Sequence, residues 1–120
     1  MFSKPSPPPL PKEFYYSALK YENTGKNKEA FKCYKVAAFL GMPEAMWNMS
    51  RCYQQGIGVR KYILDELIWL ERAANAGHIV SMVQFADLFE KGELVGRNEE
   101  IAQKWYNAAV MELWNRTVTC

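Results

Sequence analysis

Residues 41–77, GMPEAMWNMSRCYQQGIGVRKYILDELIWLERAANAG, carry the pattern that decides the fold of this chain. Shifting this stretch forward by 36 residues pairs its glycines and a tryptophan with residues of the same kind: Gly41 with Gly77, Gly56 with Gly92 and Trp69 with Trp105. Shifting it backward brings Ala73-Ala74 onto Ala37-Ala38. A fixed period of this length, with glycines closing apolar segments, is typical of a stack of helical repeats.

Each repeat predicts two helices that pack against each other. Apolar residues at helical spacing, closed by glycine, predict helices over about residues 11–23, 28–40, 44–55, 62–76, 79–91 and 99–115. Asn27 and Asn98 are the expected caps of the second and sixth helices. Short loops favour antiparallel neighbours, and the pairs stack because one pair cannot bury its apolar face alone. We therefore expect an all-α, right-handed α-solenoid of three antiparallel helix pairs, with no strand.

The chain divides into an arm, a repeat region and a short tail. Residues 1–12 hold every proline but one and predict an extended polyproline arm. Residues 13–115 form the solenoid, with units at about 13–41, 42–77 and 78–115, and residues 116–120 form a tail. Within the arm, Pro8, Pro9, Leu10 and Pro11 resemble a WW-domain ligand. An arm without a core of its own needs a surface to hold it, either on its own repeats or on a neighbour.

Composition and charge narrow the classes of function. The net charge is +2 with both signs mixed along the chain, so no basic stripe for nucleic acid is expected. No apolar run is long enough for a signal peptide or a membrane span, so we expect no direct membrane insertion. The expected compartment is the cytoplasm, with organellar import left open. Three widely spaced cysteines (Cys33, Cys52 and Cys120) and one histidine predict reduced thiols and no metal site.

The same residues offer no catalytic arrangement. His78 follows a helix-ending glycine and has no evident nucleophile or fixed carboxylate near it. The glycine-rich GIGVR loop lacks the lysine and hydroxyl residue of a phosphate-binding loop and has no strand before it. We therefore expect no enzyme activity and no cofactor, with an enzyme as the remote alternative.

The repeat residues also carry a family resemblance. The second unit has an aromatic residue, a loop, a tryptophan and an alanine pair in order: Tyr53, Gly56-Ile57-Gly58-Val59, Trp69, Ala73-Ala74 and Gly77. The third unit has Phe89, Gly92, Val95, Asn98, Ala102, Trp105 and Ala109 at the matching places. Over about residues 13–114 the chain resembles Sel-one-like repeats, a branch of the tetratricopeptide-like superfamily. Three positions depart from the family pattern: Tyr62 replaces a capping aspartate, Glu66 an alanine and Leu94 a loop glycine. The first unit, with a shorter loop, looks more like an ordinary tetratricopeptide repeat.

The resemblance implies an adaptor or scaffold that binds other proteins. In this superfamily the first helix of each pair lines a concave face. Mapped by repeat position, that face holds Tyr15, Leu19, Glu22, Trp47, Arg51, Gln54, Val80, Val83, Asp87 and Glu90. Trp47 lies off the stripe expected to face the core, and it either contacts a partner or packs between neighbouring first helices.

A second candidate surface lies at the C-terminal end. The predicted sixth helix has more apolar residues than one core-facing stripe can hold, so part of it must be exposed or covered from outside. We expect Met111 and Trp114 to make that contact. Our prediction is a non-enzymatic interaction scaffold, a small structural or accessory subunit of a larger assembly whose partners are protein subunits or peptide segments. The alternative is a free-standing adaptor that binds short peptides in the concave groove.

Overall fold

The structure, a computed structural model, describes residues 3–118 and contains six helices in that range. They are α1 (Pro11–Asn23), α2 (Asn27–Phe39), α3 (Pro43–Gln55), α4 (Ile63–Asn75), α5 (Ile79–Lys91) and α6 (Glu99–Val118). No residue from 3 to 118 lies in a strand, so the predicted all-α class is confirmed. α6 runs to Val118 and thus includes residues that the sequence placed in the tail.

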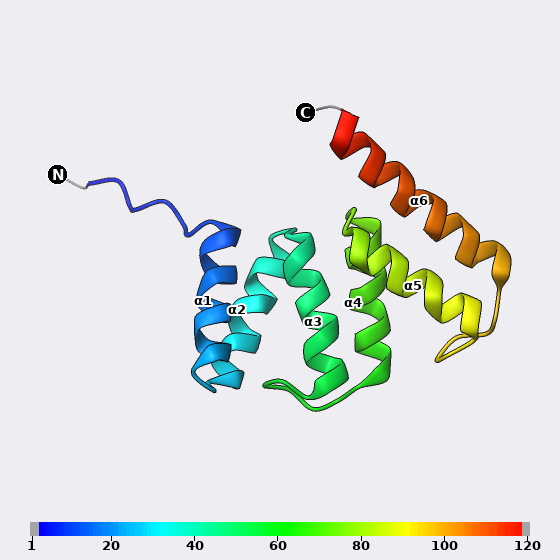
Figure 1. Cartoon of the computed structure of the whole chain (residues 1–120). Helices are drawn as coiled ribbons and strands as arrows, with labels where there is room; N and C mark the ends of the chain where they lie inside the picture. Colours follow the sequence, from blue (N-terminus) through cyan, green and yellow to red (C-terminus); the bar gives the residue numbers. More distant parts are fainter. Residues whose placement is uncertain (1–2, 119–120) are drawn as a thin grey trace.

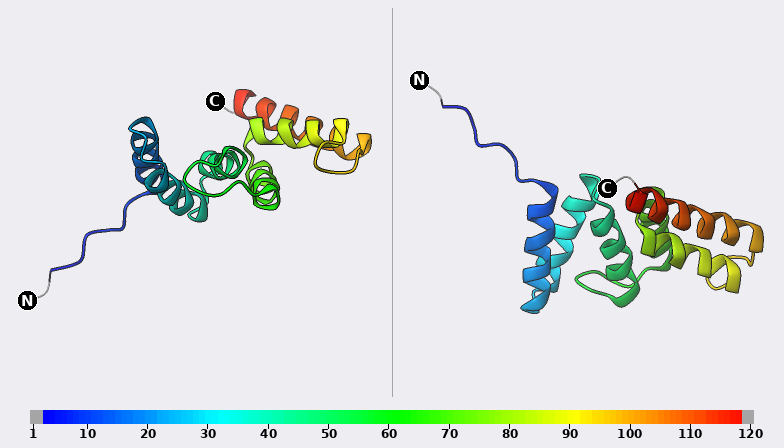
Figure 2. Two further views of the ribbon diagram at one scale, coloured as in Figure 1. Left: turned by 90° about the horizontal axis from the view of Figure 1, so that it is seen from below. Right: turned by 45° about the horizontal axis from the view of Figure 1, so that its top comes forward.

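The helices form three antiparallel pairs stacked in chain order. The pairs are α1–α2, α3–α4 and α5–α6, and they join where α2 meets α3 and where α4 meets α5 (Figure 1). With its arm included, the chain has extents of 62 × 39 × 24 Å. The last pair lies at an angle to the first two, as the turned views make clear (Figure 2). This architecture is the predicted α-solenoid.

Local chemistry explains where most helices begin and end. Proline occupies the first turn of α1 and of α3, where its missing N–H costs nothing. Gly56 ends α3 in the left-handed conformation, at φ 75°. The Asn98 side chain accepts a hydrogen bond from the Ile101 N–H at 3.0 Å, so this predicted cap is confirmed. The predicted Asn27 cap is wrong: α2 begins one residue earlier, which makes Lys26 the N-cap residue and puts Asn27 in the first turn.

The loop of the second unit packs against the first pair. Gly58 has φ 70°, and a Cβ added there would lie 2.1 Å from the Asn27 carbonyl oxygen. Only glycine allows that close approach of two backbones. In the third unit the matching residue is Leu94, which keeps the left-handed conformation at φ 64° although it is not glycine. The loop shape is therefore preserved across the substitution, at some cost in backbone strain.

The core consists of two clusters that meet at α4. The first joins the first two pairs and includes Tyr34, Met49, Cys52 and Trp69, all nearly or fully buried. The second joins α4 to the last pair through Leu70, Ala74, Met82, Phe85 and Ala109. Trp69, Ala73 and Ala109 are buried as predicted, whereas Trp105 is only half-buried. Trp105 packs edge-on against Phe85, but Asn75 stands 36 residues after Phe39, the residue whose ring packs on Trp69.

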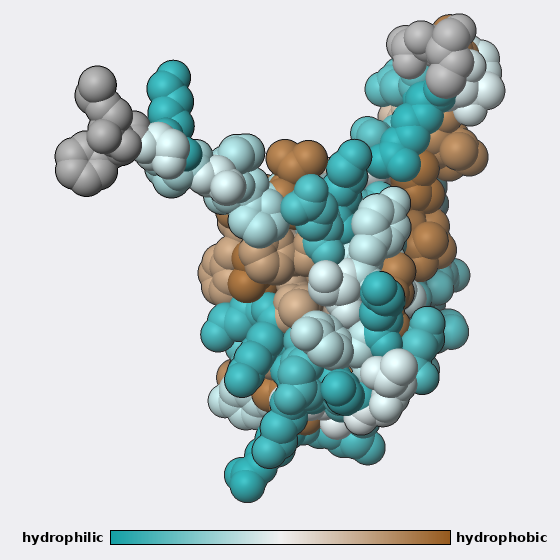
Figure 3. All heavy atoms as spheres, turned by 90° about the vertical axis from the view of Figure 1, so that its left-hand side faces the viewer, coloured by the Kyte–Doolittle hydropathy of each residue, from teal (hydrophilic) through white to brown (hydrophobic). Residues whose placement is uncertain are grey.

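The outer face of α1 is mostly polar, with Tyr16, 59% exposed, as its one large aromatic residue. The inward residues Ala45, Met49 and Cys52 of α3 pack on α2, and the equivalent positions of α1 hold Glu13, Ser17 and Lys20, all exposed. Hydrophilic side chains cover much of this end of the molecule (Figure 3). A polar outer face of this kind is what a capping repeat presents to water.

Candidate functional site

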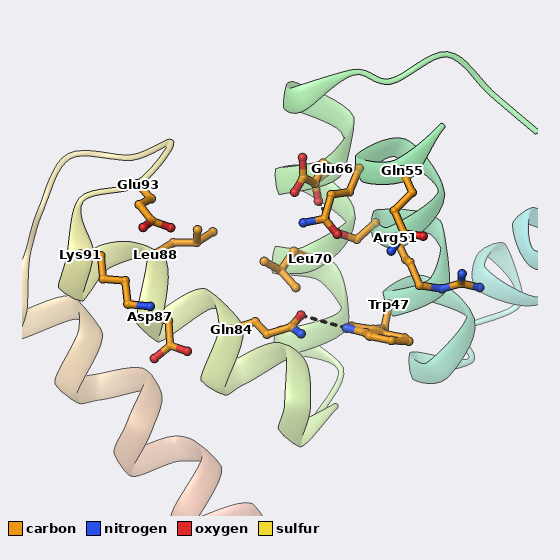
Figure 4. A pocket seen from close by; sticks show the side chains of 12 residues that line it. Trp47, Arg51, Gln55, Glu66, Leu70, Gln84, Asp87, Leu88, Lys91 and Glu93 are labelled. Carbon is orange, nitrogen blue, oxygen red and sulfur yellow. Dashed lines mark hydrogen bonds between the residues drawn. The ribbon is translucent and has the colours of Figure 1, made fainter. Parts of the chain in front are cut away.

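A hollow of about 410 Å³ opens between α3, α4 and α5. Leu70 of α4 and Leu88 of α5 point toward each other across it (Figure 4). Polar side chains surround this apolar floor: Trp47, Ser50, Arg51, Gln54, Gln55, Glu66, Gln84, Asp87, Lys91 and Glu93. We call this space the α3–α5 hollow.

The structure divides the ten predicted groove residues among several places. Trp47, Arg51, Gln54 and Asp87 line the α3–α5 hollow. Tyr15 and Val80 line a second hollow of about 170 Å³, together with Trp47 and His78. Glu90 lines a third, beside α6. Leu19 and Val83 are exposed but line none of these three, and Glu22 is bound to Arg51.

Glu22 and Arg51 satisfy each other across the first junction between pairs. Arg51 donates two hydrogen bonds to the Glu22 carboxylate, at 2.8 and 2.6 Å, and the Tyr34 hydroxyl donates a third at 2.8 Å. The hydrogen bonds from Arg51 lower the pKa of Glu22, outweighing a smaller opposing effect of burial. Arg51 also donates to Asn48 Oδ1. Two residues that the sequence offered as partner contacts are therefore engaged within the fold.

Asp87 and Glu90 share a partner on α6. The Tyr106 hydroxyl lies within hydrogen-bond distance of both carboxylates and shares its one hydrogen between them, which raises the pKa of Tyr106. The two acidic residues thus tie the last two helices together. One oxygen of Asp87 accepts the tyrosine hydrogen, while the side chain still lines the α3–α5 hollow.

Trp47 bridges neighbouring first helices. Its indole N–H donates to Gln84 Oε1 on α5 at 2.9 Å (Figure 4). Its ring lies 5.8 Å from the ring of His78. Trp47 therefore packs between neighbouring first helices, which is one of the two roles that the sequence analysis allowed for it. The half-buried indole still lines both hollows, so it can also meet a bound segment.

The residues that α4 and the loop between α5 and α6 contribute to the α3–α5 hollow were not identified from the sequence. Glu66 lies in the first turns of α4, and its burial raises the pKa of its carboxyl group. The matching residues of the other units, Ala30 and Ala102, are buried. The departure at Glu66 was therefore the available signal, because a charged side chain stands where the other units pack alanine.

The outer face of α6 is apolar and exposed. Leu70 and Ala74 of α4 pack against α5. The residues at the equivalent places of α6, 36 positions later, are Tyr106 and Val110. Val110 is 64% exposed and Trp114, one turn further, 62%. Met111, Leu113 and Val118 are exposed beside them. We call the surface formed by these five residues, Val110, Met111, Leu113, Trp114 and Val118, the α6 face.

The last turns of α6, which carry part of the α6 face, lie over the turn between α4 and α5. Arg116 donates to the Gly77 carbonyl oxygen at 2.6 Å and to Glu112 at 3.1 Å, which anchors the last turns of α6 over that turn. The helix continues beyond its neighbours at this end (Figure 1). The exposed apolar residues are therefore held in a regular helix.

The arm leaves the body of the molecule. Residues 3–10 are exposed and extend away from the helices (Figures 1 and 2). Leu10, at φ −75° and ψ 154°, has polyproline II geometry, and Pro11 is already the first residue of α1. Of the four arm residues singled out, Pro8, Pro9 and Leu10 are thus available to a neighbour, whereas Pro11 is half-buried.

The potentially reactive side chains have structural roles. Burial raises the pKa of the Cys52 thiol to about 12 and also raises that of Cys33. His78 Nδ1 accepts from the Ser81 N–H and lies 2.7 Å from its hydroxyl, so this ring caps α5. Among residues 3–118 no group of three or more potential metal ligands comes together. In that same range no helix is both long and apolar enough to cross a membrane.

Comparison with known proteins identifies the repeat. The family model described as "Sel1 repeat" matches residues 43–66, 67–78 and 80–112. Chitin synthase regulatory factor 2 of Schizosaccharomyces pombe is 28% identical over 79 residues, or 66% of this chain. A Sel1 repeat protein from Oxalobacter formigenes has 29% identity and a TM-score of 0.77 over 85% of the chain. A protective antigen present in uropathogenic Escherichia coli strains, with an SLR fold, has 27% identity and a TM-score of 0.74 over 85% of the chain.

The chain spans only part of each of these proteins. It covers 15% of the fission-yeast protein, 43% of the Oxalobacter chain and 23% of the Escherichia coli chain. The similarity therefore extends to the repeats and not to the remainder of those proteins.

Proposed function

Because the chain belongs to the Sel1 repeat family, whose members generally mediate protein–protein interaction, we propose that it is a non-enzymatic scaffold that acts as a small accessory subunit. The α6 face is the observation that supports this proposal. A contiguous apolar surface on an otherwise soluble domain usually marks an interface. The name of the fission-yeast relative, a regulatory factor, is in keeping with a protein that acts on other proteins.

The repeat itself indicates what covers the α6 face. The equivalent faces of α2 and α4 are occupied by α3 and α5, each an amphipathic helix of 13 residues. The partner contact proposed for α6 is a helix of the same kind, with small and apolar residues along one side. A second copy would not supply such a helix from its α1, because Glu13, Ser17 and Lys20 make that outer face polar.

The arm and the compartment complete the proposal. Polyproline segments are already extended and lose little entropy on docking, so residues 3–10 suit a second contact with the same assembly. We place the assembly in the cytoplasm, where the free thiols of Cys33 and Cys52 would stay reduced.

A matched pair of substitutions tests the α6 face. Trp114→Glu puts a charge in its centre, whereas Leu64→Glu makes a similar change at a 59% exposed residue in the first turn of α4. In affinity purification from the native source, we expect Trp114→Glu to lose the co-purifying subunits and Leu64→Glu to keep them. Losing an anchoring tryptophan costs about 2 kcal/mol or more, roughly a thirty-fold loss of affinity.

Two results would count against the proposal. One is retention of every partner by the Trp114→Glu protein while circular dichroism shows an intact fold. The other is a dimer of the purified chain that Trp114→Glu converts to a monomer, which would assign the face to a second copy.

A specific observation also supports the second candidate, a peptide-binding adaptor. The α3–α5 hollow lies on the side lined by first helices and has a volume within the usual range for ligand sites. In that case partner binding would depend on the hollow and would tolerate Trp114→Glu.

A further inference from the structure

The two junctions between helix pairs differ in how their concave sides are filled. At the first junction Tyr34, Glu22 and Arg51 come together from α2, α1 and α3. The Arg51 guanidinium carbon lies 6.0 Å from the centre of the Tyr34 ring. The chain thus closes this junction with its own arginine, whose guanidinium group has a carboxylate partner and an aromatic ring beside it.

The second junction has the same places but different residues. Leu70 stands where the first junction has Tyr34, and Asp87 stands where it has Arg51, each 36 residues later. Aligning the starts of α1 and α3 puts Gln54 in the place of Glu22. All three replacements line the α3–α5 hollow. At the second junction Leu70 is smaller than Tyr34, and Gln54 and Asp87 form no ion pair like that of Glu22 and Arg51. The space that these residues fill at the first junction is therefore open at the second.

The lining of the hollow is unbalanced toward negative charge. Glu66, Asp87 and Glu93 line it, and none of them belongs to an ion pair among residues 3–118. Of the two basic residues, Arg51 is committed to Glu22, which leaves Lys91 alone on the rim. Burial raises the pKa of Glu66, as expected for a carboxylate without a nearby cation. The hollow therefore favours a cation.

The remaining lining selects the kind of cation. Leu70 and Leu88 provide an apolar floor for a hydrocarbon stem (Figure 4). Gln54, Gln55 and Gln84 also line the hollow with neutral amide groups, of which the Gln84 oxygen already accepts from the Trp47 indole. Several acceptors spread around one space suit the planar, five-donor guanidinium better than a compact ammonium group.

We propose that the α3–α5 hollow binds an arginine side chain from an extended segment of a partner protein. The partner's arginine completes the second junction as Arg51 completes the first, with its charge facing Asp87 and its stem on Leu70. The inference rests on the proposed function only in requiring a protein partner, and it concerns a surface separate from the α6 face.

A titration with small probes tests the site without knowledge of the partner. The full chain, labelled with ¹⁵N, is titrated with N-acetylarginine amide and, in parallel, with the neutral analogue N-acetylcitrulline amide. We expect the arginine probe to shift the indole signal of Trp47 and the side-chain amide signals of Gln54 and Gln55, and citrulline at equal concentration to leave them in place. Added salt should weaken the arginine shifts, because the attraction is electrostatic.

Two carboxylate variants locate the charge. Asp87→Asn should weaken arginine binding about five-fold or more, because it replaces a charge-assisted hydrogen bond by a neutral one. Glu90→Gln is the matched control, since Glu90 bonds the same Tyr106 hydroxyl but lines a different hollow. Equal shifts with arginine and citrulline, or equal weakening by both variants, would overturn the assignment. The Trp114→Glu chain should bind the probe normally, so failure here is distinct from failure of the α6 face.

Discussion

Glu22 accepts hydrogen bonds from two other helices, and its charge is the basis of a pH-dependent contribution to stability. Its pKa is lowered in the folded protein, chiefly by Arg51. A carboxylate with a lowered folded pKa stabilises the fold at pH values above its unfolded pKa of about 4.3. That contribution is lost as the pH falls through the folded pKa.

Substituting Glu22→Gln tests this reasoning. We expect the free energy of unfolding at pH 7 to fall by about 1–3 kcal/mol, the range for a hydrogen bond to a charged group. The difference from the unsubstituted protein should begin to shrink below about pH 4, where Glu22 is protonated in the unfolded chain, and disappear below its lower folded pKa. Urea unfolding at pH 7 and pH 3 measures both values. Glu99→Gln is the control, because its exposed pair with Arg97 should contribute under about 1 kcal/mol. A constant difference at both pH values would contradict the assigned role.

At the scale of elements, equivalent tryptophans of α4 and α6 have different surroundings. Trp69 is 6% exposed, packs edge-on against Phe39 and has the Arg72 guanidinium 4.7 Å from its ring centre. Trp105 occupies the same repeat position in α6 but is half-buried. Phe39 of the preceding pair covers Trp69, and the residue 36 positions after Phe39 is Asn75, which has no ring to cover Trp105 in the same way.

We therefore expect unequal costs from the same substitution. Trp69→Ala should lower the free energy of unfolding by about 3–5 kcal/mol, the range for a large buried side chain. Trp105→Ala should cost about half as much, because less apolar area leaves water when it packs. Denaturant unfolding of both variants gives the comparison. A loss under about 1 kcal/mol for Trp69→Ala would place the repeat register in error.

At the scale of the whole molecule, the two core clusters suggest unequal resistance to opening. The larger cluster holds the first two pairs together, whereas the smaller one holds the last pair to α4. In a solenoid each unit contacts only its neighbours, so stability varies along the array. Within residues 3–118, no further unit packs on the outer side of the last pair.

Native-state hydrogen exchange should reveal this gradient. We expect the slowest amides in α2, α3 and α4, faster exchange in α5 and α6, and the fastest helical exchange in the last turn of α6. The Trp105→Ala variant should accelerate exchange in α5 and α6 more than in α1 and α2. Equal protection across all six helices would show instead that the three pairs open as one unit.

The sequence alone determined the repeat architecture. The 36-residue register, the apolar spacing and the glycines specified six helices in three pairs, because these signals depend on neighbours close in the chain. It also indicated that α6 has more apolar residues than its pair can cover, and the exposure of Met111 and Trp114 follows that pattern. The one cap placed wrongly, Asn27, was displaced by a single residue at a helix start.

Only the tertiary structure decided the geometry of the candidate sites. Arg51 could be assigned to the concave side from its repeat position, but its pairing with Glu22 joins residues 29 positions apart on different pairs. The α3–α5 hollow depends on Leu70, Glu66 and Asp87 meeting from α4 and α5, and so on how the last pair lies against the second. That arrangement is set by the packing of side chains far apart in the sequence, whose shapes must fit together in space, and a repeat period carries no record of that fit.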